Sequence, residues 1–387
     1  MNIPNTTDVA VVGCGIFGLS TAAFAALSGK QVVALERTHI GGGSSGRSGA
    51  IIRAFYYQKK MAQNVARCRE NVWNAFDEVF KIKSDGEPVF RKTGMITISS
   101  PEIDGNVDFR EWGIDIGTLT HEAVRDEFKY LRALMDHETV WWDGEAGYVH
   151  TALALNRLRE CIENHGGVVA EHSPVTSITK QSGGAWLIET PNGNVSSGAV
   201  VIAPGPWANE LGRMVDLELP VQPQRVQVAL LNRQGTLPQQ LPVISDRVND
   251  FYARSLDGGI SHVGFVSHFE RTPLESMTDF DESIRPDLAR ILFRRFGQGL
   301  PVARNSLVLG HRAAVYSVTS DEYFILGKTP QPNLFVAAGG SGHGYKFGPV
   351  VGRDMASLID GADAPFANDP MFAFEREFKE GRGVLGN

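Results

Sequence analysis

The chain has 387 residues, of which 42% are hydrophobic and 21% are charged, and its formal net charge at pH 7 is −7. This composition is typical of a folded globular protein, and the length favours two domains over one. The acidic balance, without a basic stripe, argues against a nucleic-acid partner.

Three widely spaced cysteines, Cys14, Cys68 and Cys161, form neither a disulfide framework nor a metal-ligand motif, so we expect no metal site. The apolar run over residues 9–27 mimics a secretion signal, but no positive charge precedes it and glycines interrupt it. No uninterrupted apolar run reaches the ~18 residues of a membrane span. The sequence therefore predicts a soluble, cytoplasmic protein with no membrane span.

The first predicted element is a buried strand over residues 9–12. Three glycines follow it at G-x-G-x-x-G spacing: Gly13, Gly15 and Gly18. Such glycines allow a tight turn, close approach to a pyrophosphate and close helix packing. A helix of small residues over 16–27 comes next, and a second strand ends at Glu36, where a carboxylate can accept hydrogen bonds from a ribose. This order predicts a dinucleotide site; the alternative is a βαβ unit without a ligand.

A second glycine-rich segment, Gly41–Gly49, has five glycines and three serines in nine residues and leads to Ile51-Ile52-Arg53. Its composition fits either a mobile surface loop or a loop whose N–H groups wrap a phosphate or a planar ring. Its place beside a dinucleotide fold favours contact with a ligand.

The next part of the chain mixes helices and strands. Spacings of three and four predict an amphipathic helix over 61–80, and residues 91–99 look like a strand. A polar helix is predicted over 121–134. The neighbours Trp141 and Trp142 cannot face the same side of a strand, so they lie in the core or an interface unless one lines a cavity.

A helix over 151–165 and a short strand over 168–170 precede a hairpin, 186–203, whose Asn192-Gly193 pair favours a tight turn. The hairpin ends in the small-residue turn Ala203–Trp207, where backbone can approach a ligand.

Polar and apolar residues alternate within 219–309, which predicts an antiparallel sheet, with a helix over 285–296. The chain then returns to α/β character: a buried strand over 333–338 opens into the glycine loop 339–344, and a helix runs to about Ile359.

Three segments, 9–36, 44–53 and 335–346, together resemble the FAD-dependent amine and amino-acid oxidoreductases of the D-amino-acid oxidase family. Sarcosine oxidases, especially the β subunit of the heterotetrameric type, are the most similar members. The resemblance covers nearly the whole chain. It implies an α/β fold with a discontinuous Rossmann-like FAD-binding domain of the glutathione-reductase type and an interleaved antiparallel-sheet substrate domain. The expected boundaries are 1–90, 146–218 and 311–387 for the FAD-binding domain, and 91–145 and 219–310 for the substrate domain.

The resemblance implies FAD as cofactor, with Glu36 at the adenosine ribose, Val175 near the adenine and the loop of residues 44–48 around the pyrophosphate and isoalloxazine. Residues 203–207 would lie along the cofactor, and 339–346 beside the flavin ring. The residues expected to bind the cofactor are Gly13, Gly15, Ile16, Phe17, Gly18, Glu36, Arg37, Ser44, Ser45, Gly46, Arg47, Ser48, Val175, Ala203, Gly205, Trp207, Gly339, Gly340, Gly342, His343, Gly344, Tyr345 and Lys346.

The resemblance also implies a substrate site. Arg53 and Lys346 match an arginine and a lysine that clamp the substrate carboxylate in monomeric sarcosine oxidases, and Tyr316 matches a tyrosine that lines that pocket. The cysteine that carries covalent FAD in those enzymes is replaced by Ala314, so we expect non-covalent FAD. A lysine that helps to activate oxygen is replaced by His262. The usual pocket histidine aligns with Val266, so no general base is assigned.

The function implied is oxidation of the C–N bond of a secondary amino acid to an imine that hydrolyses, with electrons passed to oxygen or another acceptor. The substrate would be an N-substituted glycine such as sarcosine, or an imino-dicarboxylate such as iminodiacetate. Surface exposure is the simplest interpretation of Arg247 and Arg254; a dicarboxylic substrate becomes favoured if either faces the cavity. The alternatives are a dehydrogenase of D-amino acids or proline-like rings, a flavin-binding subunit that passes electrons to a partner subunit, and an NAD-dependent dehydrogenase.

Overall fold

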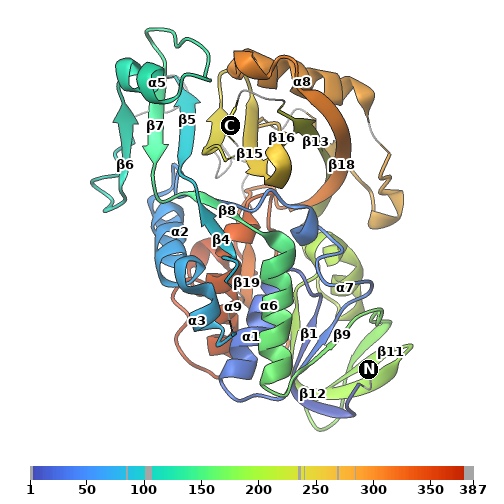
Figure 1. Cartoon of the computed structure of the whole chain (residues 1–387). Coiled ribbons are helices and arrows are strands. Elements are labelled where there is room, and N and C mark those ends of the chain that lie inside the picture. The colour runs from blue at the N-terminus through green and yellow to red at the C-terminus, as the bar shows by residue number, and fades with distance from the viewer. Residues whose placement is uncertain are drawn as a thin grey trace.

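The computed structural model describes residues 3–83, 86–100, 107–233, 237–238, 240–267, 270–283 and 285–378. The chain is built around two large sheets, one above the other in Figure 1, with a small three-stranded sheet near the junction. This architecture confirms the predicted α/β fold class. The small sheet joins β3 (Ile51–Ile52), β8 (Gly147–Val149) and β4 (Phe90–Lys92).

The lower sheet has eight strands and a parallel centre. Parallel pairs join β1 (Thr6–Val12), β2 (Val32–Leu35), β9 (Val168–Ala170), β12 (Gly193–Ile202) and β20 (Leu334–Ala338). Antiparallel strands β10 (Ser177–Lys180), β11 (Trp186–Thr190) and β19 (Ile325–Lys328) complete it. The central strands are continuous apolar runs because both faces of a parallel sheet are covered. The carboxyl ends of β1 and β20 both open into glycine loops.

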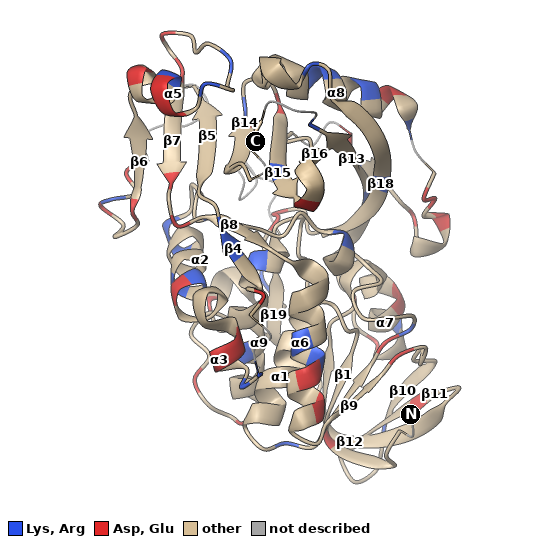
Figure 2. Cartoon of the chain, in the orientation of Figure 1, with Lys and Arg blue, Asp and Glu red and all other residues tan. Residues whose placement is uncertain are grey.

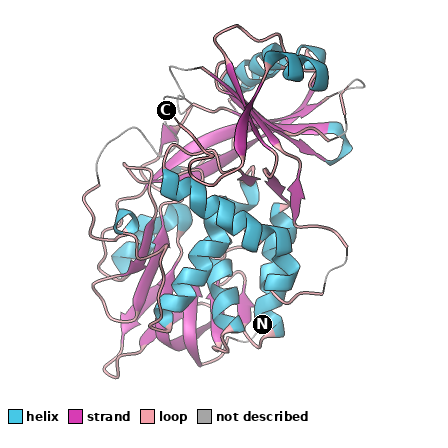
Figure 3. Ribbon diagram, turned by 90° about the vertical axis from the view of Figure 1, so that its left-hand side faces the viewer, coloured by secondary structure: helices cyan, strands magenta, loops and turns pink. Residues whose placement is uncertain are grey.

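Helices cover this sheet. Helix α1 (Ile16–Leu27) packs between α6 (Thr151–Asn164) and α9 (Gly348–Ile359), while the short α7 (Ala208–Met214) contacts β10. Figure 3 shows a group of long helices against one face of the lower sheet. Helix α1 matches its predicted bounds, and its Ala and Ser residues allow the close packing on two sides.

The upper sheet has nine strands. Its order is β17 (Thr272–Pro273), β13 (Gln222–Asn232), β16 (Ile260–Gly264), β15 (Phe251–Leu256), β14 (Val243–Asp246), β5 (Met95–Ser99), β7 (Thr139–Asp143) and β6 (Ile116–Leu119), with β18 (Leu307–Val318) paired to β13. All its pairs are antiparallel except β14–β5. Helix α8 (Pro286–Gly299) packs on this sheet. Strand β18 crosses residue 311, where the sequence places a domain boundary; the domain boundaries stay a prediction.

Three predicted elements are wrong in extent. The amphipathic helix is broken: α2 (Lys59–Asn71) stops before Val72, and a 3-10 turn leads to α3 (Phe76–Val79). The strand predicted over 91–99 is two strands, β4 and β5, separated by a turn at Gly94 with φ +73°. The polar helix is only α5 (His121–Glu127). At Gly94 the reason is local, because a positive φ interrupts the extended backbone of a strand.

The tryptophan pair lies on β7, as alternation requires. Trp141 packs against Phe55 and Phe109 in the lower core, with ring centroids 5.8 and 5.5 Å away. Trp142 faces the other side and packs against Phe128. Core packing is therefore the role of both rings.

Acidic and basic residues are interspersed along the described part of the chain in the cartoon of Figure 2, where no continuous basic stripe is seen. Across the described ranges, no helix combines the length and apolar character that crossing a membrane requires.

Candidate active site

The turn between β1 and α1 depends on two glycines. Gly13 has φ +103°, and a Cβ on it would lie 2.3 Å from the Ala203 carbonyl oxygen. A Cβ on Gly18 would lie 1.8 Å from the Gly13 carbonyl oxygen. No side chain therefore fits at either place without moving strand, turn or helix.

The N-terminus of α1 is left open to an anion. Gly15 occupies the N-cap position, with no side-chain hydrogen bond to the cap and no acidic residue in the first turn. The positive end of the helix dipole is therefore unneutralised by the helix itself, which suits a pyrophosphate. The N-terminus of α1 is therefore compatible with binding the pyrophosphate of a dinucleotide.

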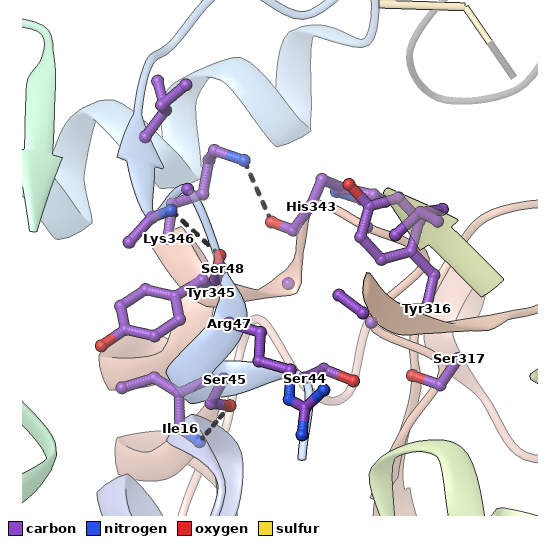
Figure 4. A pocket seen from close by; sticks show the side chains of 18 of the residues that line it. Ile16, Ser44, Ser45, Arg47, Ser48, Tyr316, Ser317, His343, Tyr345 and Lys346 are labelled. Atoms are coloured by element: carbon purple, nitrogen blue, oxygen red, sulfur yellow. Dashed lines mark hydrogen bonds between the residues drawn. The ribbon is translucent and has the colours of Figure 1, made fainter. Parts of the chain in front are cut away.

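The serine-glycine loop is anchored to the rest of the site. The Ser45 hydroxyl accepts a hydrogen bond from the Ile16 N–H at 2.9 Å (Figure 4), the Ser44 hydroxyl donates to the Val315 carbonyl, and Arg47 donates to the Ala313 carbonyl at 3.1 Å. The loop thus joins the start of α1 to β18. Of the two interpretations of Gly41–Gly49, these hydrogen bonds favour the loop that borders a ligand site.

The Glu36 carboxylate accepts hydrogen bonds from the backbone N–H groups of Cys14 and Thr38, both at 3.0 Å. It therefore lies at the end of β2, against the glycine turn. Nearby, the Arg37 guanidinium stacks on the ring of Trp207, 4.8 Å from its centroid.

A cavity of about 240 Å³ opens between the two large sheets. The predicted site residues that line it are Gly15, Ile16, Phe17, Ser44, Ser45, Arg47, Ser48, Arg53, Ala203, Gly205, Tyr316, Gly339, Gly340, Gly342, His343, Gly344, Tyr345 and Lys346. Those outside its lining are Gly13, Gly18, Glu36, Arg37, Gly46, Val175, Trp207 and His262. Figure 4 shows Ile16 and Ser45 at one end of the cavity and Lys346 toward the other. The two glycine loops, far apart in sequence, thus share one cavity.

Arg53 and Lys346 converge on Tyr56. The Arg53 Cζ lies 4.8 Å and the Lys346 Nζ 5.6 Å from the centroid of that ring. The Lys346 ammonium also donates to the His343 carbonyl at 3.1 Å (Figure 4). Burial, and then the charge of Arg53, lower the pKa of Lys346 well below its usual range. A carboxylate bound between the two side chains would oppose both effects, so the pair is suited to hold one anion.

A tyrosine pair forms the wall contributed by the upper sheet. The hydroxyls of Tyr252 on β15 and Tyr316 on β18 are hydrogen-bonded to each other. The Arg271 guanidinium lies 5.2 Å from the Tyr316 ring centroid and is paired with Glu322 at 3.3 Å. Burial raises the pKa of both tyrosines, so both remain neutral phenols.

The expectation of surface exposure is wrong for both spare arginines. Arg254 is only 7% exposed and stacks on Tyr148, with its Cζ 4.6 Å from the ring centroid. Arg247, which follows β14, lines the cavity and lies 5.5 Å from the ring centroid of Tyr57. The cavity therefore has a cation beside Tyr57 as well as the two beside Tyr56.

His262 lies behind the cavity wall. Its ring stacks on Tyr252, with centroids 6.0 Å apart, and its Nε2 would be 3.6 Å from a Cβ on Gly49. Burial, followed by the charges of Arg254 and Arg312, lowers the pKa of His262 to about 3. The ring is neutral at physiological pH, so it does not reproduce the charge of a lysine.

Sequence reasoning missed the cavity-lining residues Glu270 and Arg271, and it favoured surface exposure for Arg247 over a place in the cavity. Arg271 and Glu270 are adjacent in an irregular segment with no periodic or glycine signal. Only the fold reveals that this segment borders the cavity.

A glycine-rich βαβ unit, a helix N-terminus with no acidic residue in its first turn and a cationic cavity under a second sheet define a Rossmann-type dinucleotide-dependent protein. The family model described as "FAD dependent oxidoreductase" (DAO) matches residues 8–358. The chain belongs to this D-amino-acid oxidase family.

Curated relatives match along most of their length. Peroxisomal sarcosine oxidase of Homo sapiens is 26% identical over 375 residues, covering 91% of each chain. Monomeric sarcosine oxidase of Bacillus sp. (strain NS-129) is 24% identical over 369 residues, covering 91% of this chain and 92% of its own. Among solved structures, glycine oxidase from Geobacillus kaustophilus is similar in fold, with a TM-score of 0.84 at 22% identity, covering 97% of this chain and 100% of its own.

Proposed function

We propose that the protein oxidises the C–N bond of a secondary amino acid with two carboxylates, an imino-dicarboxylate such as iminodiacetate. The observation that carries this proposal is the position of Arg247 in the same cavity as Arg53 and Lys346. The sarcosine oxidases among its relatives support an N-substituted glycine as the core of the substrate.

In this proposal the chain positions the substrate by charge. Arg53 and Lys346 hold the carboxylate next to the reacting carbon, and Arg247 holds the second carboxylate beside Tyr57. Tyr316 and Tyr252 close the side facing the upper sheet. FAD, when bound, supplies a two-electron acceptor for the hydride that leaves the carbon next to nitrogen, and the resulting imine hydrolyses. Fixing both ends of a short molecule aligns its C–H bond in advance of reaction.

The proposal is tested by anaerobic bleaching. The purified protein should be yellow, and iminodiacetate should bleach the flavin at lower concentration than sarcosine or D-amino acids. A yellow protein that no amine bleaches would favour the alternative of a flavin-binding subunit that receives electrons from a partner. Reoxidation by oxygen, compared with a quinone, would identify the acceptor; the neutral His262 supports an acceptor other than oxygen.

The Arg247→Met variant should affect a substrate with two carboxylates more strongly than a substrate with one. A charge-assisted hydrogen bond contributes about 1.5–3 kcal/mol, so kcat/KM for iminodiacetate should fall roughly 10- to 150-fold. The kcat/KM for sarcosine, which has one carboxylate, should change less than about threefold. The matched control is Arg304→Met, at an exposed arginine outside the cavity. Equal losses for both substrates would contradict the assigned role of Arg247.

We also propose that FAD is held non-covalently, because Ala314, buried in the cavity wall, has no nucleophile. None of the three cysteines, all of them within the described ranges, lines the cavity. Precipitation with acid should release all yellow colour into the supernatant. Colour that stays with the denatured protein would refute non-covalent binding.

A further inference from the structure

Glu270 is the only carboxyl residue among the described residues that line the cavity. It lies just after β16, on the side of the upper sheet, and is 7% exposed. Its Oε2 is buried and has no hydrogen-bond partner among the residues that the structure describes. A buried polar atom without a partner is rare in proteins, and here it belongs to a group that borders the space for substrate.

The charged groups around Glu270 are engaged with other partners. Arg271 pairs with Glu322, while Asp250 pairs with Arg295 and accepts a hydrogen bond from the Ser267 hydroxyl at 2.7 Å. Burial raises the pKa of Glu270 to about 7; Arg271 and Arg295 oppose this shift and Asp250 adds to it. The neutral phenols of Tyr252 and Tyr316 face the same region. A carboxyl group in this environment is suited to accept a proton near neutral pH.

The proposed reaction needs a group with this property. A secondary amino acid binds mainly as an ammonium ion, whose nitrogen has no free electron pair, and oxidation requires that pair. Arg53, Arg247 and Arg271 cannot accept a proton. His343 is engaged at both nitrogens, by Tyr56 at 3.3 Å and by the Glu322 carbonyl at 2.9 Å.

We propose that Glu270 takes the proton from the substrate's ammonium group. The N–H bond breaks, the proton moves to Oε2, and the electron pair stays on nitrogen. This inference rests on the proposed amino-acid substrate. The cavity then binds the substrate with two kinds of group. The arginines and Lys346 hold its carboxylates, and Glu270 deprotonates its ammonium group.

The test compares Glu270→Gln with the unaltered holoenzyme by anaerobic stopped-flow reduction with iminodiacetate. In the unaltered enzyme, the second-order rate of flavin reduction should fall as pH drops through about 7, because the protonated carboxyl cannot accept a proton. In the variant, the flavin should be reduced about 100-fold more slowly at pH 7. The acidic limb of the pH profile, which is the fall in rate as pH drops through about 7, should be absent. The rate of flavin reduction in the variant should instead rise at higher pH, where solvent deprotonates the amine.

Diglycolate, in which an ether oxygen replaces the nitrogen, provides a readout that is independent of turnover. It has both carboxylates but no ammonium, so its Kd, measured from its effect on the flavin spectrum, should change less than threefold in Glu270→Gln. This result would show an intact cavity. A variant that keeps the rate and the limb near pH 7 overturns the proposal, and so does equal weakening of diglycolate binding and reduction.

If Glu270→Gln fails to retain FAD, Glu270→Asp takes its place. It keeps a carboxyl group, so the limb should persist at a lower absolute rate; its absence overturns the proposal. Failure of the proposed function has a different signature, because then the unaltered enzyme is not reduced by any amino acid.

Discussion

Arg53→Ala should lower kcat/KM for the amino-acid substrate at least 30-fold while leaving FAD content unchanged. Removing one partner of a buried, hydrogen-bonded charge pair costs about 2–5 kcal/mol, of which 2 kcal/mol is already roughly 30-fold. Most of the loss should be in KM, because the carboxylate is held equally before and during reaction. The measurement is steady-state kinetics together with the ratio of flavin to protein absorbance.

Two further variants sharpen this prediction. Arg53→Lys keeps the charge but not the planar fork, so it should restore only part of the loss. Arg67→Ala, at an exposed position on α2, should be neutral. Kinetics unchanged in Arg53→Ala would remove Arg53 from the substrate site, and loss of FAD would show that it supports the cofactor instead.

Gly18→Ala should abolish FAD binding. The added methyl carbon would lie 1.8 Å from the Gly13 carbonyl oxygen, a distance that no side-chain adjustment relieves because the contact is with backbone. Separating α1 from β1 would displace the helix N-terminus from its position near the proposed pyrophosphate site. The purified variant should be colourless, and adding FAD should not raise its melting temperature, in contrast to the unaltered protein.

The matched control is Gly183→Ala, where an added methyl meets no atom within 4 Å and φ is ordinary. That variant should stay yellow and melt close to the unaltered protein. A yellow Gly18→Ala protein with a normal melting temperature would contradict this prediction, because it would show that the turn accommodates the methyl group without loss of FAD or stability.

The βαβ unit could be predicted because its signals are local. Strand, glycines, helix and Glu36 follow one another within one short stretch, and each has a conformational reason. The arginine and lysine proposed to hold the substrate could be found only by resemblance, because nothing in the composition around Arg53 or Lys346 shows that the chain brings both to Tyr56.

What the sequence could not provide depends on contacts between distant segments. The spacing of apolar residues in α2 gives no signal that Arg69 is buried and paired with Asp143 at 2.9 Å. Burial and the charge of Asp250, which is distant in the sequence, raise the pKa of Glu270, against the opposing charges of Arg271 and Arg295. The sequence pattern around a side chain indicates neither its distant partner nor its burial in the fold.

The meeting of two distant glycine loops in one cavity has a consequence for synthesis of the protein. Roughly 300 residues separate Ser45 from Lys346, and at about 5–20 residues per second a ribosome takes roughly 15–60 s to make them. During that time β1 lacks first β12, its neighbour in the sheet, and then β20 beyond it. The cofactor site is complete only after nearly the whole chain has emerged. Binding of FAD at the complete site therefore follows synthesis of nearly the whole chain.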